Sequence, residues 1–520
     1  MIITCIPLDK RPYNYQFLKQ ISNIDKEIEL ILPDKQKLGE KKDIANINYL
    51  QNFLLENSKK SDALIISIDM LIYGGLFPAR IHNNNISTLK NRLNILKFIK
   101  QKYPNIKIYI SNLILRTPKY NSNEEEPYYY AKYGKHIFLY GYYLDKIKNT
   151  IKLSKKEYKT FKLIKNTLPK KYLKDFINRR YINREITTYC LNLCKKNIID
   201  IMIIPQDDSS KYGFTAIDQR FLYKYISQHR LQKKVFLHPG TDESGCTLLT
   251  RAYLDKKGSL NIFPIYSTNE FKHFVPNYED RPFEESFISH TMACNINIVD
   301  NLEDADFCIA ISGAPGIMQE AFEISHKITI NKIKKHSLEK NILYYRNRNL
   351  QNFANKIQKI LDKNINIGIL DVAMSNGGEK ELIEILDNNN LIEQISAYSG
   401  WNTTCNSLGT ILATLSFCHY GNNLEAIENF KLSRIISDWT YQTETRFDIE
   451  LNYLNLFNAT YSNFNNKEKE IFKIIKTKLE NNIKKVFKNS YINKNIIISN
   501  ISAPFNRLSG LEFDIILENK

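Results

Sequence analysis

The sequence lacks the motifs that identify several common kinds of site. Its eight cysteines are dispersed with no CxxC pair, and its nine histidines form neither an HxH nor an HExxH motif. We therefore expect no zinc site, no disulfide framework and no cofactor, and interpret the cysteines as structural thiols of a reducing compartment. A Mg²⁺ or Mn²⁺ site built from aspartates alone would leave no such motif, so a divalent metal stays open.

Long hydrophobic segments are also missing. No run of eighteen apolar residues occurs, and residues 1–9 contain no basic region ahead of a long apolar stretch. A transmembrane helix needs about 20 mostly apolar residues, and a signal peptide needs such a basic region. We therefore predict a cytoplasmic protein without a membrane partner.

The sequence has fewer acidic than basic residues. The chain has 73 Lys and Arg against 55 Asp and Glu, which gives a net charge of +18. Much of the excess lies in residues 146–174 and 467–494, where lysines alternate with Ile, Leu, Phe and Tyr at helical spacing. This pattern favours the solvated faces of amphipathic helices over a phosphate-binding surface, so no nucleic-acid partner is expected.

Short Ile-rich runs alternate with amphipathic helical patterns along most of the 520 residues. This alternation predicts an α/β protein whose parallel sheets are flanked by helices. The strands of the first series are predicted at residues 2–8, 28–32, 63–68, 106–113, 199–204 and 234–238. A second series is predicted at residues 260–266, 296–299, 307–311, 365–370 and 394–398.

The two series suggest two open Rossmann-like units. We expect a first α/β unit at residues 1–255 with a helical insertion at about 118–185, and a second α/β unit at residues 256–420. Residues 421–520 are expected to form a mainly helical C-terminal region with a terminal strand. An alternative closes the first eight strands, to about residue 300, into a (β/α)₈ barrel followed by one such unit. The sequence does not indicate the oligomeric state.

In both topologies a ligand would bind at the carboxyl ends of the strands. The apolar strand at 199–204 leads directly into two adjacent acids, Asp207 and Asp208. Like-charge repulsion and partial desolvation at such a position push two pKa values apart, as general acid–base catalysis requires. We predict that both are catalytic, although an Asx turn that caps a helix would also explain them.

Other strand ends supply candidate substrate-binding residues. Each combines an acid with groups that could clamp a polar ligand, and capped helix starts are the simpler interpretation. The candidates of the first series are Asp9, Arg11, Asn14, Asp69, Tyr73, Arg80, Asp242 and Glu243. His238 with Asp242 is also a candidate proton or metal handle.

The second series adds Asp371, Asn376, Trp401, Asn402 and Asn406. An indole can stack on the apolar face of a sugar ring while neighbouring amides bond its hydroxyl groups. A helix N-cap would explain Asn402 but not the whole cluster. Arg116 and the Glu124–Glu126 run precede three tyrosines that could form a stacking wall, although acidic runs are usually solvated.

Taken together, the motifs resemble the bacterial family called domain of unknown function 4127, over essentially the whole chain. The resemblance implies one functional unit of about 500 residues, and it implies no reaction. The motifs that carry it are Pro7–Pro12, Asp69–Leu76, Pro205–Asp208, Gly240–Glu243, Asn376–Gly378, Gly400–Thr403 and Arg446–Phe447.

We expect an enzyme with a small-molecule substrate, a sugar. The adjacent acids resemble those of retaining β-N-acetylhexosaminidases, so Asp207 would orient the substrate and Asp208 would act as acid and base in a carbohydrate-active hydrolase. A rival is a metal-dependent sugar isomerase or phosphate-handling enzyme that uses Asp9, Asp69, Asp208 and Asp242. The third possibility is a non-catalytic sugar-binding protein.

Overall fold

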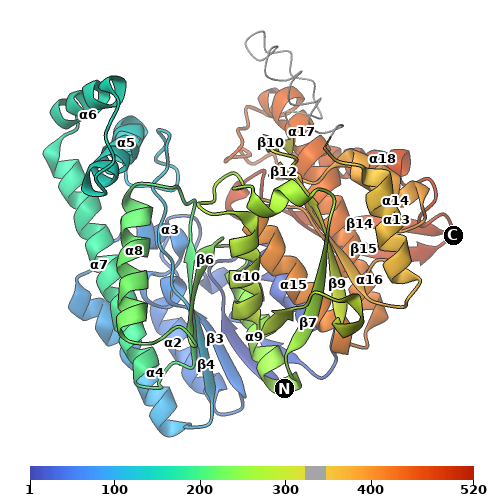
Figure 1. Ribbon diagram of the computed structural model, residues 1–520, viewed down its shortest axis with the longest axis horizontal. Helices are drawn as coiled ribbons and strands as arrows, with labels where there is room; N and C mark the ends of the chain where they lie inside the picture. Colours follow the sequence, from blue (N-terminus) through green and yellow to red (C-terminus); the bar gives the residue numbers. More distant parts are fainter. Residues whose placement is uncertain (322–346) are drawn as a thin grey trace. The chain divides into compact units, whose positions relative to one another are not determined.

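The computed structural model describes residues 1–321 and 347–520, and these divide into two compact units (Figure 1). Both units are discontinuous in sequence. Unit 1 comprises Met1–Lys10, Ile28–Leu248 and Tyr278–Arg281. Unit 2 comprises Arg11–Glu27, Leu249–Asn277 and Pro282–Lys520.

Unit 1 is built on a parallel six-stranded sheet in the order β2-β1-β3-β4-β5-β6. Its Ile-rich central strands are buried, because helices cover both faces of such a sheet. The strands are β1 (Ile2–Ile6), β2 (Glu29–Ile31), β3 (Ala63–Ser67), β4 (Lys107–Ser111), β5 (Ile201–Gln206) and β6 (Val235–Pro239). The accompanying helices are η1 (Lys35–Lys37), α2 (Ile47–Ser58), η2 (Asp69–Tyr73), α3 (Leu76–Ile81), α4 (Ile86–Lys102), α8 (Phe214–Gln228) and the start of α9 (Ser244–Lys257).

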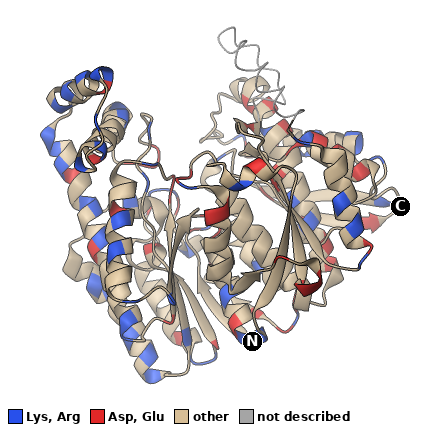
Figure 2. Ribbon diagram, viewed as in Figure 1, with Lys and Arg blue, Asp and Glu red and all other residues tan. Residues whose placement is uncertain are grey.

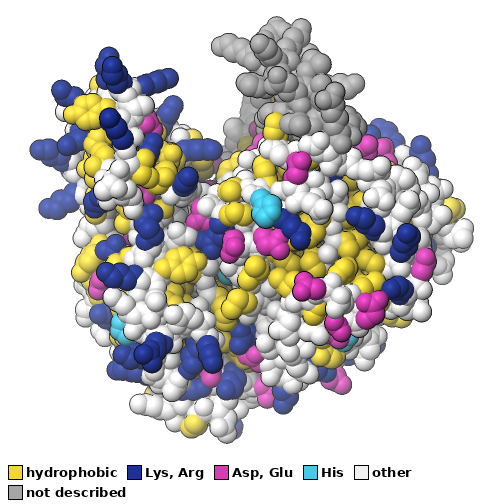
Figure 3. All heavy atoms as spheres, in the orientation of Figure 1, with side chains coloured by type: hydrophobic (Ala, Val, Ile, Leu, Met, Phe, Trp, Pro, Cys, Tyr) yellow, Lys and Arg dark blue, Asp and Glu magenta, His cyan; other side chains and the backbone are white. Residues whose placement is uncertain are grey.

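Three further helices separate β4 from β5, where the sequence predicts a helical insertion. They are α5 (Tyr130–Lys148), α6 (Lys155–Thr167) and α7 (Lys170–Lys195). A small aromatic core that includes Tyr130, Phe161 and Phe176 holds them together. Most of their lysines are exposed. Figure 2 marks Lys and Arg in blue along the ribbon of α6, and Figure 3 shows blue side chains at the surface of the same part of the molecule. The predicted amphipathic character of this segment is therefore confirmed.

Unit 2 contains a parallel five-stranded sheet in the order β13-β11-β9-β7-β8. If its strands are numbered along the chain, this is the order 2-1-3-4-5, which the first five strands of unit 1 also follow. The five strands are β7 (Leu260–Tyr266), β8 (Ile296–Ile298), β9 (Phe307–Gly313), β11 (Ile367–Val372) and β13 (Ala397–Ser399). A separate pair is formed by β10 (Gln319–Glu320) and β12 (Met374–Ser375).

Helices make up most of the remainder of unit 2. They are α1 (Gln16–Ser22), η3 (Asn269–His273), α10 (Phe283–Cys294), η4 (Leu302–Asp304), α13 (Leu350–Leu361), α14 (Lys380–Asn388), α15 (Thr404–Tyr420), α16 (Leu424–Arg434), η5 (Ile435–Thr445), α17 (Arg446–Asn452), η6 (Leu454–Phe457), α18 (Glu468–Val486) and η7 (Pro504–Asn506). The sequence predicts one terminal strand, whereas the structure has two, β14 (Lys494–Ser502) and β15 (Glu512–Asn519), paired antiparallel.

The predicted fold class is confirmed: this is an α/β protein with open parallel sheets, flanking helices and a helical C-terminal region. The barrel alternative is wrong. Within the described residues β7 and β8 pair into the second sheet through β9, so the first eight strands do not close on themselves. All eight cysteines are buried and unbridged, as expected. Among the described helices, none combines the length and the apolar character that crossing a bilayer requires.

Two π-helices are features that the sequence did not predict. The first, η2, follows β3 and ends at Gly74 and Gly75, whose φ values of 86° and 132° suit glycine. The second, η5, runs over Ile435–Thr445 in unit 2. Because π-helical turns widen the backbone and often occur at functional sites, both direct attention to the polar residues that they carry.

Candidate active site

The carboxyl edge of the sheet in unit 1 is lined by buried polar side chains. Asp9 follows β1, Asp69 follows β3, Asp207 follows β5, and His238 lies near the end of β6. In a sheet with this strand order the connections change direction between β1 and β3, and ligand crevices form at such a point. Asp9 and Asp69 flank it.

Two arginines hold together the acids at the centre of this edge. Arg80 donates from Nη2 to Asp207 Oδ2 at 2.5 Å and from Nη1 to Glu125 Oε2 at 2.9 Å. The side chain of Arg80 is only 3% exposed, so these are charge-assisted bonds in a largely dry setting.

Arg116 completes the arrangement. It donates to Asp208 Oδ2 at 3.2 Å, to Glu125 Oε2 at 2.6 Å and to Glu126 Oε1 at 3.0 Å. Four carboxyl groups therefore surround two guanidinium groups. We call this set the carboxylate network: Arg80, Arg116, Glu125, Glu126, Asp207 and Asp208.

The two adjacent aspartates have different surroundings. Asp207 is 7% exposed and bonded to Arg80. The side chain of Asp208 is 33% exposed, and its backbone is left-handed, with φ of 39°. Burial raises the pKa of Asp208, Arg116 lowers it, and the neighbouring Asp207 raises it again. Asp208 is thus the more accessible of the two acids, and its surroundings raise its pKa on balance.

Asp69 lies at the start of the π-helix η2 and is 1% exposed. Its Oδ2 accepts from the backbone N–H of Leu113 at 3.0 Å and from Asn112 Nδ2 at 3.4 Å. Burial raises the pKa of Asp69 to about 7, against the effect of these hydrogen bonds. Tyr73, on the same helix, is 2% exposed and packs on His82 with ring centroids 4.6 Å apart. Tyr73 is therefore an interior residue and offers no open ring face to a substrate.

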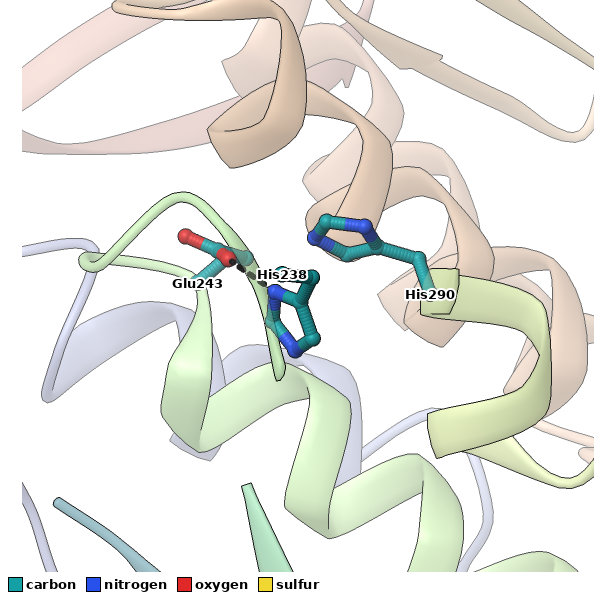
Figure 4. A group of neighbouring side chains, drawn as sticks. All are labelled: His238, Glu243 and His290. Atoms are coloured by element: carbon teal, nitrogen blue, oxygen red, sulfur yellow. Dashed lines mark ion pairs between the residues drawn. The ribbon is translucent and has the colours of Figure 1, made fainter. Parts of the chain in front are cut away.

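The loop after β6 holds a second buried acid. His238 Nδ1 donates to the Pro239 carbonyl oxygen at 2.9 Å and lies 3.8 Å from Glu243 Oε1 (Figure 4). Burial raises the pKa of Glu243 to about 8. Asp242 is also buried. Glu243 therefore lies beside His238, which the sequence suggested together with Asp242 as a proton or metal handle.

The sequence reasoning missed the segment Tyr278–Arg281, which belongs to unit 1. The Tyr278 carbonyl accepts from the Ser209 N–H at 2.9 Å. Asp280 accepts from Gln206 Nε2 at 3.2 Å and from its neighbour Arg281 at 2.8 Å. This segment therefore braces the loop that carries Asp207 and Asp208. Its run of adjacent charged residues, Glu279-Asp280-Arg281, was the available signal.

Unit 2 has its own buried acids at the carboxyl edge of its sheet. Asp371, at the end of β11, accepts at Oδ2 from the Tyr398 hydroxyl and the Glu379 N–H, both at 2.7 Å. Burial raises the pKa of Asp371 to about 7, and the charge of Glu379 adds to this. A Cβ atom at Gly378 would lie 2.2 Å from the Tyr398 hydroxyl, so this glycine permits a close approach.

Asp438, from the π-helix η5, lies in the same part of unit 2. It accepts from Arg434 Nη1 at 3.0 Å and from the Gly400 N–H at 3.1 Å. Burial raises its pKa to about 6 while Arg434 lowers it. No sequence motif pointed to Asp438 or Arg434, because Asp438 lies 38 residues along the chain from Gly400, which follows β13, and Arg434 acts through Asp438.

The predicted amides of unit 2 occupy tight turns. Asn376 and Asn402 have φ values of 62° and 53°, and the Asn376 N–H donates to the Asn402 carbonyl at 2.8 Å. Asn14 and Asn406 are buried within the same unit. Trp401 is 5% exposed and stacks on Tyr13 with centroids 4.6 Å apart.

Other side chains of unit 2 pack around the indole of Trp401. Phe17 packs against it edge-on at 5.7 Å, and its Nε1 donates to Thr410 Oγ1 at 3.3 Å. Arg11 lies over the Tyr13 ring at 4.8 Å and bonds its hydroxyl at 2.8 Å. Trp401, Tyr13 and Arg11 thus form a stack in which Trp401 and Arg11 are buried. A tryptophan that stacks on a sugar needs an exposed ring face, and Tyr13 covers one face of this indole.

The predicted site residues fall into two groups. Unit 1 holds Asp9, Asp69, Tyr73, Arg80, Asp207, Asp208, Asp242 and Glu243. Unit 2 holds Arg11, Asn14, Asp371, Asn376, Trp401, Asn402 and Asn406. Only Lys10 separates Asp9 from Arg11 in sequence, yet the two residues belong to different units.

Comparison with protein families agrees with the motifs. Residues 3–514 match the family model described as "Protein of unknown function (DUF4127)". The chain belongs to this family. The resemblance expected from the strand-end motifs is thereby confirmed, and DUF4127 covers both units. None of the curated proteins that were compared matches the chain. Membership of DUF4127 brings no reaction with it, so function has to be argued from the side chains.

Proposed function

We propose that this protein is a carbohydrate-active hydrolase in which Asp208 is the general acid and base and Asp207 orients the substrate. One observation carries the proposal: two adjacent carboxyl groups in unit 1 differ in exposure, in backbone conformation and in hydrogen bonding. Pairs of acids whose surroundings separate their behaviour are the usual basis of acid–base assignments.

The charges of the carboxylate network favour a proton on Asp208. Four carboxyl groups share two guanidinium groups, so full ionisation leaves excess negative charge in a poorly hydrated region. The most exposed member of the set, Asp208, can exchange a proton with a substrate at the lowest cost. Asp207, held by Arg80, keeps a fixed position as a hydrogen-bond acceptor.

The proposed reaction follows the substrate-assisted route of retaining N-acetylhexosaminidases. Asp207 accepts a hydrogen bond from the acetamide N–H, and the acetamide oxygen attacks the anomeric carbon. Asp208 donates its proton to the leaving oxygen as the glycosidic bond breaks. Water then attacks the anomeric carbon, opens the cyclic intermediate and returns a proton to Asp208.

The test compares Asp208→Asn with the wild type on 4-nitrophenyl N-acetyl-β-glucosaminide. We expect turnover to fall by about 10²–10⁴-fold while binding of N-acetylglucosamine, measured by calorimetry, is retained. Asp200→Asn is the matched control. Asp200 precedes the opposite end of β5, where it pairs with Lys100 at 3.0 Å, and its replacement should leave turnover unchanged. Full turnover in Asp208→Asn would refute the assignment.

Turnover and binding measured on a panel of sugars separate the two rival functions. Loss of activity in a chelator, restored by Mn²⁺, would assign the site to a metal-dependent sugar isomerase or phosphate-handling enzyme. Tight sugar binding without any conversion would identify a non-catalytic binding protein.

A further inference from the structure

Unit 1 contains a pocket of about 450 Å³ that shares a residue with the carboxylate network. Its volume lies within the range of small-molecule sites, about 300–1,000 Å³. Its lining includes Lys42, Glu126, Tyr128, Lys171, Tyr172 and Arg179.

One wall of the pocket is a face of helix α7. Tyr172, Asp175 and Arg179 are spaced three and four residues apart, so their side chains line the same side of the helix. Arg179 Nη2 binds both oxygens of Asp175, at 3.0 and 2.9 Å, and Asp175 also accepts from Tyr129 OH at 2.7 Å. The carboxylate on this wall is therefore already neutralised.

Tyrosine rings form a second wall. Tyr129 stacks on Tyr172 with centroids 4.9 Å apart, and Tyr128 meets Tyr172 edge-on at 5.7 Å. Tyr128 is 69% exposed, so most of its ring is available to a ligand. These are two of the three tyrosines that follow the acidic run, for which the sequence suggested a stacking wall. Such rings stack well on the apolar face of a sugar.

Two lysines give the pocket positive charge. In the part of the chain that the structure describes, neither Lys42 nor Lys171 is within ion-pair distance of a carboxylate. Lys42 Nζ donates to the Glu126 carbonyl at 2.9 Å, and Lys171 Nζ lies 4.9 Å from the centre of the Tyr172 ring. Burial lowers the pKa of Lys42, whereas nearby glutamates, Glu126 first, raise it. An anion bound here would favour the charged form of Lys42.

The pocket is connected to the proposed catalytic acid through Glu126. The carboxylate of Glu126 accepts from Arg116 at 3.0 Å, and the same arginine contacts Asp208 at 3.2 Å. Glu126 is paired with Arg116 and also lies close enough to Lys42 for its charge to raise the pKa of that lysine. Two side chains, Glu126 and Arg116, therefore link a ligand in the pocket to the group that donates the proton.

We propose that this pocket binds a sugar ring bearing a negatively charged group, adjacent to the ring whose bond is broken. The location beside Asp208 rests on the proposed function, whereas binding of the anionic ring rests on the pocket alone. Tyr128 would contact the apolar face of the ring, and Lys42 and Lys171 would meet its carboxylate or phosphate.

Calorimetry at low salt tests the proposal with methyl β-glucuronide, glucose 6-phosphate and the uncharged methyl β-glucoside. We expect whichever charged ligand binds more tightly to bind about tenfold better than the uncharged glucoside. This difference in affinity should shrink in about 0.5 M salt, because screening is strong at that ionic strength. Preference for the glucuronide identifies a carboxylate, and preference for glucose 6-phosphate identifies a phosphate. Equal binding of all three ligands would overturn the proposal.

Matched variants locate the binding. Lys171→Gln should weaken the charged ligand about two- to fivefold, whereas Lys174→Gln, also on α7 but outside the pocket lining, should change it little. Tyr128→Ala should weaken all three ligands, with Tyr158→Ala on α6 as the exposed control. If Lys171→Gln and Lys174→Gln behave alike, the pocket is not the site.

The two proposals fail in different ways. Asp208→Asn should lower turnover by about 10²–10⁴-fold and leave glucuronide or phosphate binding unchanged. Normal turnover in Asp208→Asn refutes the hydrolase assignment and says nothing against the pocket. Unchanged binding in Lys171→Gln refutes the pocket even when Asp208→Asn is inactive.

Discussion

Replacing Asp69 with Asn should change how the stability of unit 1 depends on pH. Burial raises the pKa of Asp69 from 3.8 to about 7 in the folded chain. Between these values the folded state keeps a proton that the unfolded state releases, so stability falls as pH rises. At 1.36 kcal/mol per pKa unit, a shift of about three units amounts to about 4 kcal/mol. About 1.5 kcal/mol of this is lost by pH 5, and about 2.5 kcal/mol more between pH 5 and pH 8.

Asn removes this titration and can still accept from the Leu113 N–H through its side-chain oxygen. Asp69→Asn should therefore gain about 2.5 kcal/mol relative to the wild type between pH 5 and pH 8. Both tryptophans, Trp401 and Trp439, lie in unit 2, so their fluorescence does not report on unit 1 directly. Hydrogen exchange of the β3 and β4 amides, corrected for intrinsic rates, measures the opening free energy instead.

The control for this experiment is Asp43→Asn, which alters an exposed acid of unit 1. The opening free energy of Asp43→Asn should change between pH 5 and pH 8 by the same amount as that of the wild type. The argument from burial is wrong if the difference in opening free energy between Asp69→Asn and the wild type changes by less than about 1 kcal/mol from pH 5 to pH 8.

Two further predictions concern packing and charge. Arg80→Met should destabilise unit 1 by about 3–5 kcal/mol, because it leaves Asp207 buried without its arginine partner. Arg80→Lys should recover part of this loss. Equal hydrogen-exchange protection of the wild type and Arg80→Met would contradict the prediction. Gly378→Ala should lower the unfolding free energy of unit 2 by about 1–3 kcal/mol, since the new Cβ would lie 2.2 Å from the Tyr398 hydroxyl. Gly510→Ala, whose Cβ would meet no atom closer than 3.9 Å, is the control, and both can be followed by tryptophan fluorescence in urea.

Local patterns in the sequence predicted the strands well. Every strand of both predicted series is present, with ends that differ by a few residues, because short Ile-rich runs between helices have few other buried arrangements. The positions of Asp69 and Asp207 at strand ends followed from the same pattern. The local sequence was enough to predict these features, since each depends on a single segment of the chain.

Features that depend on distant segments were not predictable in this way. The pairing of Arg80 with Asp207 joins residues 127 positions apart, and Asp438 contacts the Gly400 amide across 38 positions. The sequence did suggest Trp401 as a sugar platform, but it could not indicate that Tyr13 already covers the indole. Partners of this kind emerge only from the tertiary fold.

Helix α1 illustrates a cost of the discontinuous units during synthesis. It belongs to unit 2, where Arg434 at the end of α16 lies 3.7 Å from the Phe17 ring and Asn423 bonds the Asn23 carbonyl across 400 residues. At about 5–20 residues per second, a ribosome needs roughly 20–80 s to make the intervening chain. The apolar face of α1, formed by Phe17, Leu18 and Ile21, is without its native cover during that interval. Nascent chains should therefore depend on chaperones more than the size of either unit suggests.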